Sequence, residues 1–410
     1  MKIAYLLKKF PRLSETFVLT EILAQEALGA EVVVFSRRAP DPEPRHPEVA
    51  RLRAAVEVFP RHSELDPWTE MFGQHQAALD VEGLSQLGRI VTELKPVLGD
   101  RLPRVLPEAL HLKRRSQEEG VDHIHVHFAT ESAIVAMIAH ELGGPTYSIT
   151  AHAKDIYRTT VRADLLNRMI AGSRFMVTVC DANLRYLQER LSDAACSKVR
   201  RLYNGLDLAN FQFRTEGRDK DHVLAVGRLV EKKGFDVLLT ALRLLKLRGR
   251  SIRATIVGQG DQEQSLRGQA QVLGLSDAEV TFTGPKDQDG VRALLESATI
   301  FSLPCVIGAD GNRDALPTVL LEALASGLPC VSTPVTGIPE ILDNGEAGLI
   351  VPERDAEALA LAMSSLLDDA DARARFAKRG LARVMELFDA EQSARTLSSW
   401  FEDSLHLEPS

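Results

Sequence analysis

The strongest constraint on the fold is an alternation of short apolar runs with amphipathic stretches, which occurs twice along the 410 residues of the chain. A polar, glycine-containing segment, TEGRDKD at 215–221, separates the two series. Strands that alternate with helices form parallel sheets that carry helices on both faces. The pattern therefore predicts an α/β protein with two doubly wound, Rossmann-like parallel-sheet domains that face each other across a cleft.

The same pattern sets the expected boundaries. We expect a first domain at 1–213, a second at 214–385 and a C-terminal helical segment at 386–410. A terminal helix without a strand partner must bury its apolar face, and packing back on the first domain is one way to do so. Residues 39–115 are interpreted as a proline-rich loop followed by helices at 67–98 and 103–119. The expected strands lie at 2–7, 32–35, 124–127, 147–150, 176–179, 199–202, 223–226, 252–257, 279–282, 299–303, 329–332 and 348–351.

Composition excludes several classes of protein. Lys and Arg total 49 and Asp and Glu total 57, which gives a net charge of -8 and makes a nucleic-acid partner a poor expectation. The four cysteines form no CxxC pair, so neither a structural zinc site nor a disulfide framework is expected. No run of about 18 apolar residues occurs, so we expect no membrane span and a cytoplasmic location.

The segment VGRLVEKKG at 226–234 is the first candidate for chemistry. Gly227 follows a predicted strand and lets the backbone turn closely, which places Arg228 and Lys233 at the carboxyl edge of the sheet. Two cations beside a helix N-terminus suit a diphosphate. The alternative interpretation is a loop that carries two solvated surface cations.

A pair of carboxylates follows in the segment 310–327. Asp314 precedes a predicted helix that has Pro317 in its first turn, and the free N–H groups of that turn, such as that of Thr318, could hold an anion. Glu322 lies inside the apolar helix, where a buried carboxylate needs partners such as the hydroxyls of a ribose. The alternative is a helix cap at Asp314 and a surface glutamate.

Together these segments resemble glycosyltransferase family 4, which has the two-domain GT-B fold. In the second half the matching segments are VGRLVEKKG (226–234), VGQGDQEQSL (257–266), VTFTGP (280–285), LLEALASGLPCVSTPVTGIPEIL (320–342) and AGLIVP (347–352). The first half resembles exopolysaccharide-type members, such as colanic-acid glycosyltransferases. Its matching segments are FPRLSETF (10–17), HIHVHFAT (123–130), TAHAKDIY (150–157), VTVCDANLRYL (177–187) and YNGLDLANF (203–211).

The resemblance implies a retaining transfer of a sugar from a nucleotide-diphosphate donor to a hydroxyl of a lipid-linked or polysaccharide acceptor. Arg228 and Lys233 would stabilise the leaving diphosphate, Asp314 would lie near the transferred sugar, and Glu322 would hold the ribose. The family pattern is Glu, seven residues, Glu, so Asp314 is one methylene shorter than the family residue. The remaining implied donor-binding residues are Gly227, Gly284, Pro285, Lys286, Leu316, Thr318 and Val319.

The first domain would present the acceptor. His152 matches a family histidine near the transferred sugar and is expected to be catalytic, with Asp155 or Lys154 orienting it. The alternative is a histidine that ends a strand and caps the next helix. Glu15 and His127 are expected on the acceptor side. The segment HIHVH at 123–127 puts its three histidines on one strand face, but a metal is disfavoured because the sequence shows no fourth ligand nearby.

No cofactor and no metal are expected. The DxD triplets at 219–221 and 287–289 are interpreted as solvated loops, and Arg228 with Lys233 would neutralise the leaving group. The basic stretch 101–115 predicts either a weak contact with an anionic membrane surface, and hence a peripheral location, or a solvated helix face. Three alternatives stay open: a glycolipid synthase that acts directly on a membrane lipid such as diacylglycerol, a nucleotide-sugar epimerase, and a protein that binds the nucleotide without turnover.

Overall fold

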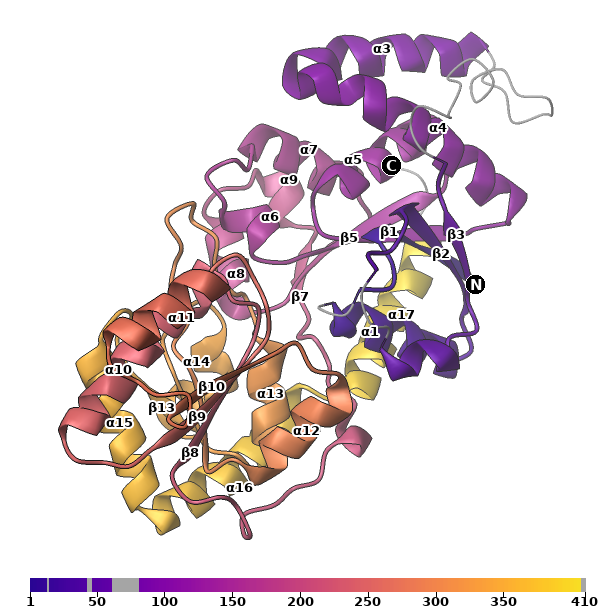
Figure 1. Cartoon of the computed structure of the whole chain (residues 1–410). Coiled ribbons are helices and arrows are strands. Elements are labelled where there is room, and N and C mark those ends of the chain that lie inside the picture. Colours follow the sequence, from indigo (N-terminus) through magenta and orange to yellow (C-terminus); the bar gives the residue numbers. More distant parts are fainter. Residues whose placement is uncertain (13–14, 43–45, 61–80, 407–410) are drawn as a thin grey trace.

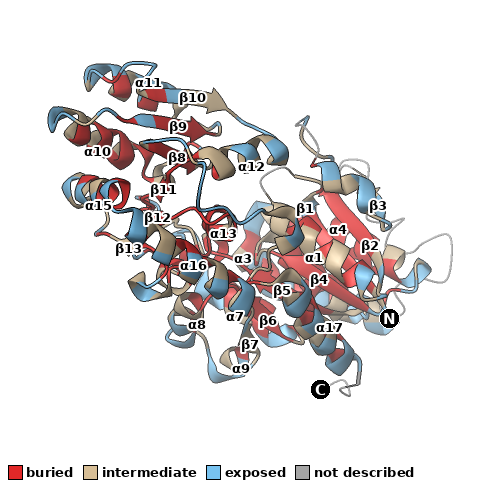
Figure 2. Ribbon diagram, turned by 90° about the horizontal axis from the view of Figure 1, so that it is seen from below, coloured by how far each residue is buried: buried red, intermediate tan, exposed pale blue. Residues whose placement is uncertain are grey.

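The computed structural model describes residues 1–12, 15–42, 46–60 and 81–406. Two parallel sheets form the centres of two domains (Figure 1). Strands of both sheets are mostly buried, and the helices around them bury one face and expose the other (Figure 2). The expectation of two doubly wound parallel-sheet domains is therefore confirmed.

The first sheet has the order β3-β2-β1-β4-β5-β6-β7, and all its paired strands run parallel. Its strands are β1 (Lys2–Lys9), β2 (Glu31–Arg38), β3 (Ala55–Val58), β4 (His123–His127), β5 (Thr146–Ala151), β6 (Met176–Thr178) and β7 (Val199–Arg201). The helices of this domain are α1 (Thr16–Ala27), α3 (Val81–Leu98), α4 (Leu102–Glu118), α5 (Glu131–Glu141), α6 (Lys154–Tyr157), α7 (Ala163–Gly172), α8 (Asp181–Gln188) and α9 (Asp193–Cys196).

The second sheet has the order β10-β9-β8-β11-β12-β13 and is also parallel. Its strands are β8 (His222–Val226), β9 (Arg253–Val257), β10 (Val280–Gly284), β11 (Ile300–Leu303), β12 (Cys330–Ser332) and β13 (Leu349–Ile350). The helices that follow β8 are α10 (Phe235–Leu247), α11 (Glu263–Val272), α12 (Gln288–Ser297), α13 (Thr318–Ala325), α14 (Ile338–Ile341), α15 (Ala356–Asp368), α16 (Ala370–Leu387) and α17 (Ala390–His406).

The order of strands fixes where ligands can bind. Each sheet reverses its direction of winding at one pair of neighbours, β1 with β4 in the first domain and β8 with β11 in the second. In open parallel sheets, ligands bind outside the carboxyl ends of the strands at such a switch point. The loops after these four strands are therefore the expected walls of a site.

The last helix returns to the first domain, as the sequence indicated. α17 packs against α1, and the side-chain amide of Gln25 donates to the carbonyl of Ala394 at 2.8 Å. Phe401 is fully buried, and its ring centroid lies 5.9 Å from that of Phe175. In Figure 1 this helix lies beside α1.

Contacts between the domains also come from α14. The carboxylate of Glu340 accepts hydrogen bonds from the backbone N–H groups of Asp181 at 2.8 Å and Ala182 at 2.9 Å. It also accepts one from the hydroxyl of Tyr203 at 2.9 Å. A carboxylate of the second domain therefore caps the N-terminus of α8 in the first, which holds the two sheets in a fixed relation.

Sequence and structure differ in two places. β3 lies within the segment interpreted as loop and helix, and its Val56 and Val58 are 41% and 42% exposed, as suits an edge strand. The helix expected at 67–98 is described from Val81, and its earlier part lies outside the described residues. In the part of the chain that the structure describes, no helix has the length and apolar character needed to cross a membrane.

Candidate active site

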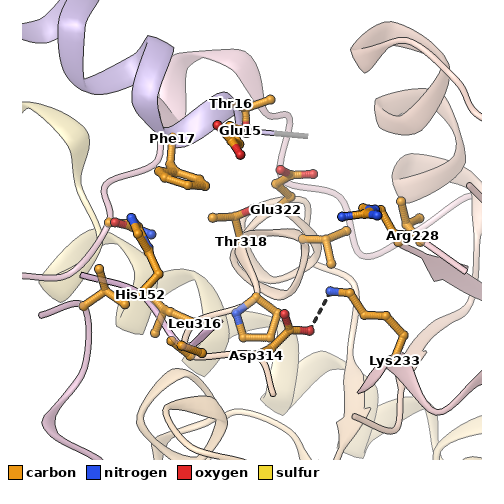
Figure 3. A pocket seen from close by; sticks show the side chains of 18 of the residues that line it. Glu15, Thr16, Phe17, His152, Arg228, Lys233, Asp314, Leu316, Thr318 and Glu322 are labelled. Atoms are coloured by element: carbon orange, nitrogen blue, oxygen red, sulfur yellow. Dashed lines mark ion pairs between the residues drawn. The ribbon is translucent and has the colours of Figure 1, made fainter. Parts of the chain in front are cut away.

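A cavity of about 370 Å³ lies where the carboxyl ends of the two sheets face each other. Residues of the first domain, among them Phe17 and His152, line one side of it, and Arg228, Lys233 and Glu322 of the second domain line the other (Figure 3). The cavity is therefore the cleft that the sequence predicted, and it contains the predicted residues of both domains.

Glycines shape the loops on the donor side. Gly234 has a φ of 66°, and a Cβ atom there would lie 1.9 Å from the carbonyl oxygen of Pro304. A Cβ atom at Gly258 would lie 1.9 Å from the carbonyl oxygen of Gly227. The loop after β8 therefore packs directly on the backbones that follow β9 and β11, and this packing fixes the position of Lys233 beside the cavity.

The cationic part of the site is centred on Asp314. Its two carboxylate oxygens pair with Lys232 at 2.8 Å and with Lys233 at 2.7 Å, and Figure 3 shows the second of these ion pairs. Arg228 is exposed on the cavity wall, and its charge acts on Lys233. Lys232, which the sequence analysis did not select, is therefore a third cation beside the place expected for the diphosphate.

The charges of Asp314 and Lys233 persist although both side chains are largely buried. Burial alone would raise the pKa of Asp314, but the ammonium groups of Lys232 and Lys233 hold that pKa well below the usual range of a carboxyl. Burial would lower the pKa of Lys233, but Asp314 raises it overall. The site thus offers permanently charged donors, which an anionic leaving group requires.

Glu322 is a different kind of carboxylate. It lies on α13, one turn after Thr318, and is partly open to the cavity. Burial raises the pKa of Glu322 to about 7, and the charges of Arg292 and Lys233 only partly oppose this shift. No described residue makes a side-chain hydrogen bond or ion pair with its carboxylate, so the group is ready to accept hydrogen bonds from a ligand.

The N-terminus of α13 faces the same space. Thr318 and Val319 begin this helix and line the cavity with Leu316, and no side chain caps the helix at Pro317. Unpaired N–H groups of a first helical turn attract anions. Lys286 also lines the cavity, whereas the preceding Gly284 and Pro285, expected to meet the base, lie outside its wall.

On the first domain, His152 lies between two aromatic rings. Its ring centroid is 4.7 Å from that of Phe17 and 4.6 Å from that of Phe128. Burial lowers the pKa of His152 well below the ordinary value, and the charges of His127 and Lys154 lower it further. His152 is therefore a neutral imidazole on the cavity wall at physiological pH.

A chain of hydrogen bonds leads from His152 into the first domain. Its Nε2 lies 3.4 Å from Nδ1 of His127, whose Nε2 lies 3.2 Å from Oε1 of Glu21. The hydroxyl of Tyr5 donates to the same carboxylate oxygen at 3.0 Å. Glu21 could not be identified from the sequence, because α1 brings it to β4 from a distant part of the chain.

Two acceptor-side predictions need correction. His127 is 1% exposed and lies behind His152, so it does not line the cleft. Asp155 does not orient the His152 ring, because its carboxylate accepts hydrogen bonds from the backbone N–H groups of His152 at 3.0 Å and Ala129 at 2.6 Å. Glu15 does line the cavity, where Arg12 pairs with it at 2.6 Å.

The three strand histidines are held by hydrogen bonds. His123 contacts the hydroxyls of Thr146 and Ser148, each at 2.8 Å. His125 and His127, with Glu21, have ligand atoms within 4.8 Å of one another, which is close enough for a metal ion. Both ring nitrogens of His125 nevertheless lie within 2.9 Å of protein hydroxyls, so the hydrogen bonds already account for them.

The acidic triplets also have structural roles. Asp287 accepts a hydrogen bond from the N–H of Gly290 at 2.9 Å and so caps α12, while Asp289 pairs with Arg292 at 2.8 Å. Asp219 pairs with Arg253. Asp219, Asp287 and Asp289 are nevertheless exposed, so the solvated interpretation of the two triplets is confirmed, and the ion pairs and the helix cap lie at the surface.

The basic stretch 101–115 is partly neutralised by carboxylates of the same chain. Lys113 is 8% exposed, and Arg114 pairs with Glu118 at 2.7 Å. Arg115 pairs with Glu57 at 2.8 Å and also with Glu118 and Glu119. Arg104 is exposed, and neither Arg101 nor Arg104 pairs with a described carboxylate, so a weak membrane contact and a solvated helix face both stay predictions.

Comparison with known families places both halves of the chain. Residues 14–210 match the model described as Glycosyltransferase Family 4, and residues 209–383 match the model described as Glycosyl transferases group 1. The fold and the cavity between its two sheets define the class of GT-B glycosyltransferases. The chain belongs to glycosyltransferase family 4.

Relatives and solved structures agree with this placement. The chain is 30% identical to WcaL of Salmonella typhimurium strain LT2, named as a colanic acid biosynthesis glycosyltransferase, over 97% of this chain and 99% of the relative. It is 28% identical to the amylovoran biosynthesis glycosyltransferase AmsK of Erwinia amylovora, over 88% and 89% of the two chains.

Two solved structures share the fold. Sucrose-phosphate synthase from Thermosynechococcus elongatus has a TM-score of 0.75 at 19% identity, over 98% of this chain and 99% of that chain. Anabaena HepE in complex with UDP and glucose has a TM-score of 0.72 at 16% identity, over 97% and 99%.

Proposed function

We propose that the protein transfers a sugar, with retention of the anomeric configuration and without a metal ion, from a nucleotide-diphosphate donor to a hydroxyl of a lipid-linked or polysaccharide acceptor. The biological process we infer is the synthesis of an exopolysaccharide or another cell-surface glycan. Support comes from the names of WcaL and AmsK, which refer to colanic acid and amylovoran biosynthesis. HepE, a structural neighbour, was crystallised with UDP and glucose.

One observation carries the proposal: Lys232, Lys233 and Arg228 lie together on the wall of a cleft that also contains Glu322 and His152. When the bond between the sugar and the diphosphate breaks, negative charge grows on the diphosphate and positive charge on the anomeric carbon. Fixed cations stabilise the first of these charges without any reorganisation during the reaction. This set of side chains would take the place of a divalent ion in that role.

The other residues have complementary roles in the proposal. Glu322 would accept hydrogen bonds from the ribose hydroxyls, and Lys286 would lie near the base. Asp314 would hold the two lysines in position and keep them charged, as its ion pairs at 2.8 and 2.7 Å support. His152, neutral and on the opposite wall, would hydrogen-bond a hydroxyl of the transferred sugar.

The test is a transfer assay with matched variants. The full-length protein is incubated with UDP- and GDP-hexoses and with extracted lipid-linked glycans, and proton NMR identifies the anomeric configuration of the product. We expect an α-linked product from an α-linked donor, with equal rates in EDTA and in added Mg²⁺. An inverted linkage, or activity that EDTA abolishes and Mg²⁺ restores, would contradict the proposal.

Lys233→Ala should lower the rate of transfer by about 10²-fold or more, as expected for the loss of one preorganised charge. Lys246→Ala is the matched control, because Lys246 also pairs with a carboxylate, that of Glu279 at 2.8 Å, but lies outside the cavity. Equal rates in the two variants would show that the cluster around Asp314 is not the site of the leaving group.

A further inference from the structure

A second cavity, of about 410 Å³, lies in the first domain next to the active site. Its walls come from the end of β1, from the loops after β4 and β5, and from α7. This position is the switch point of the first sheet, where parallel sheets bind ligands. We call this cavity the basic pocket, because its wall includes the basic residues Lys8, Arg37, Arg101, Lys154, Arg158 and Arg162.

Carboxylates balance only half of these charges: Arg37 pairs with Glu108, Arg158 with Asp310 at 3.1 Å, and Arg162 with Asp164 at 2.6 Å. The acidic residues on the described wall are Glu131 and Asp155. Glu131 pairs with Arg37 at 3.3 Å. Asp155 is occupied by backbone N–H groups, at 2.6 Å from that of Ala129 and 3.0 Å from that of His152.

Three of the cations remain without an acidic partner among the described residues. Lys8 and Arg101 have neither a hydrogen bond nor an ion pair to the described part of the chain, and Nζ of Lys154 lies 4.0 Å from the centre of the Phe128 ring. Lys154 forms no ion pair with a described carboxylate, although the charges of Glu15 and Asp155 attract it while those of Arg12 and Lys8 repel it. Like charges that converge on one cavity repel each other, and a bound anion would remove that repulsion.

The N-terminus of α5 adds a further attraction for an anion. Ala129, Thr130 and Glu131 line the pocket where this helix of 11 residues begins, and no side chain caps the helix at Thr130. The first N–H groups of a helix and its dipole favour a phosphate. The basic side chains and the N-terminus of α5 therefore both favour a negatively charged ligand.

The lining of the basic pocket also includes apolar residues, which we call the apolar wall: Ile134, Val161, Leu165, Leu166 and Met169. An inorganic anion would gain nothing from such a wall, whereas an amphiphile would bury its first carbons there. The pocket thus fits a phosphate that is attached to a hydrocarbon chain.

The basic pocket and the cavity of the active site share one lining residue. Lys154 lines both cavities and follows His152 by two positions. A glycan joined to a phosphate in the basic pocket would therefore start beside the active-site wall that carries His152.

We propose that the basic pocket binds the phosphate or diphosphate of a lipid-linked glycan acceptor, with Lys8, Arg101 and Lys154 on the phosphate and the apolar wall on the first carbons of the lipid. This inference rests on the proposed function and names the group by which the acceptor is anchored. It favours a phosphate-linked acceptor over a neutral membrane lipid.

The test measures binding by calorimetry on the full-length protein, with farnesyl diphosphate as the probe. Farnesol lacks the phosphates and inorganic pyrophosphate lacks the lipid, so the two serve as comparison ligands. The pocket variant is Lys8→Ala/Arg101→Ala. Lys233→Ala perturbs only the donor side, and Lys378→Ala removes an exposed lysine on α16 as a control.

We expect farnesyl diphosphate to bind at least about tenfold more weakly to the pocket variant, since two charge-assisted contacts are lost. Binding to the other two variants should match that of the unmodified protein, and both comparison ligands should bind more weakly than farnesyl diphosphate. Loss of binding in Lys233→Ala alone would place the diphosphate in the donor site and overturn the inference. The inference would also be overturned if pyrophosphate or farnesol bound as tightly as farnesyl diphosphate.

A second measurement separates this inference from the proposed function. UDP and GDP are titrated into the pocket variant, whose thermal unfolding is also recorded to show that it folds. Retained nucleoside-diphosphate binding together with weakened farnesyl diphosphate binding supports both statements. The unmodified protein could instead bind farnesyl diphosphate as predicted but bind neither UDP nor GDP. That result would contradict the proposed donor site and would still support the basic pocket.

Discussion

Replacing Glu322 by Gln should make the free protein more stable at alkaline pH and weaken its binding of nucleotide. Burial raises the pKa of Glu322 from the ordinary value of 4.5 to about 7. Because the folded pKa exceeds the unfolded pKa, the ionised carboxylate costs stability, and that cost grows as the pH rises from 4.5 through 7. A Gln side chain of the same shape never ionises and so avoids this cost.

The magnitude follows from these two pKa values. The quantity compared is the free energy of unfolding of the unmodified protein minus that of Glu322→Gln. Linkage predicts that this difference falls by about 2.5 kcal/mol when the pH is raised from 5 to 8.5. For domains of this size that corresponds to a shift of about 5–10 °C in the midpoint of thermal unfolding. Other titrating groups are common to both proteins and cancel in the comparison.

The assay is thermal unfolding of both proteins at pH 5, 7 and 8.5, with Glu386→Gln, an exposed position on α16, as the control. Glu322→Gln should gain stability over the unmodified protein as the pH rises, whereas Glu386→Gln should not. At pH 8 the same Glu322→Gln protein should bind a nucleoside diphosphate more weakly, because a carboxylate accepts stronger hydrogen bonds than an amide. A stability difference that does not change with pH would refute the reasoning.

Three further predictions concern the loop after β8, the acceptor wall and the C-terminal helix. Gly234→Ala should destabilise the protein by more than about 2 kcal/mol in urea unfolding, because its Cβ would lie 1.9 Å from the carbonyl oxygen of Pro304. The control Gly268→Ala has open space around the new methyl group and should stabilise the protein by about 0.5–1 kcal/mol. His152→Ala should lower transfer by about 10²-fold yet leave nucleoside-diphosphate binding unchanged in calorimetry, and equal loss of both would contradict its place on the acceptor wall. Phe401→Ala should cost about 3–5 kcal/mol in the same unfolding experiment, since the ring is fully buried, and a cost below about 1 kcal/mol would show that α17 is not part of the first domain's core.

The fold could be predicted from the sequence because its central strands are buried on both faces and therefore read as continuous apolar runs. β8 is almost entirely buried, and its residues 223–226 are all apolar. β3 escaped detection because it is an edge strand in which both valines are exposed and a glutamate separates them, so it has no such run. Local pattern thus identifies the centre of a parallel sheet better than its edge.

The candidate site could be predicted only in part. Residues that follow a strand directly, such as Arg228 and His152, could be placed because the strand fixes their edge of the sheet. Lys232 and Glu21 were missed, since their importance depends on contacts with Asp314 and His127 that only folding creates. For the same reason the ion pairs of Arg115 could not be predicted, because its partner Glu57 lies on the distant strand β3.

The central claim is that the cleft between the two sheets binds the donor through the Asp314 cluster and Glu322. A crystal structure of the protein with a bound nucleoside diphosphate tests it most directly. The account predicts phosphate oxygens within about 3 Å of the Lys233 ammonium or the Arg228 guanidinium, and ribose hydroxyls at the same distance from Glu322. A nucleotide bound elsewhere, with these side chains still turned only toward the protein, would contradict the account.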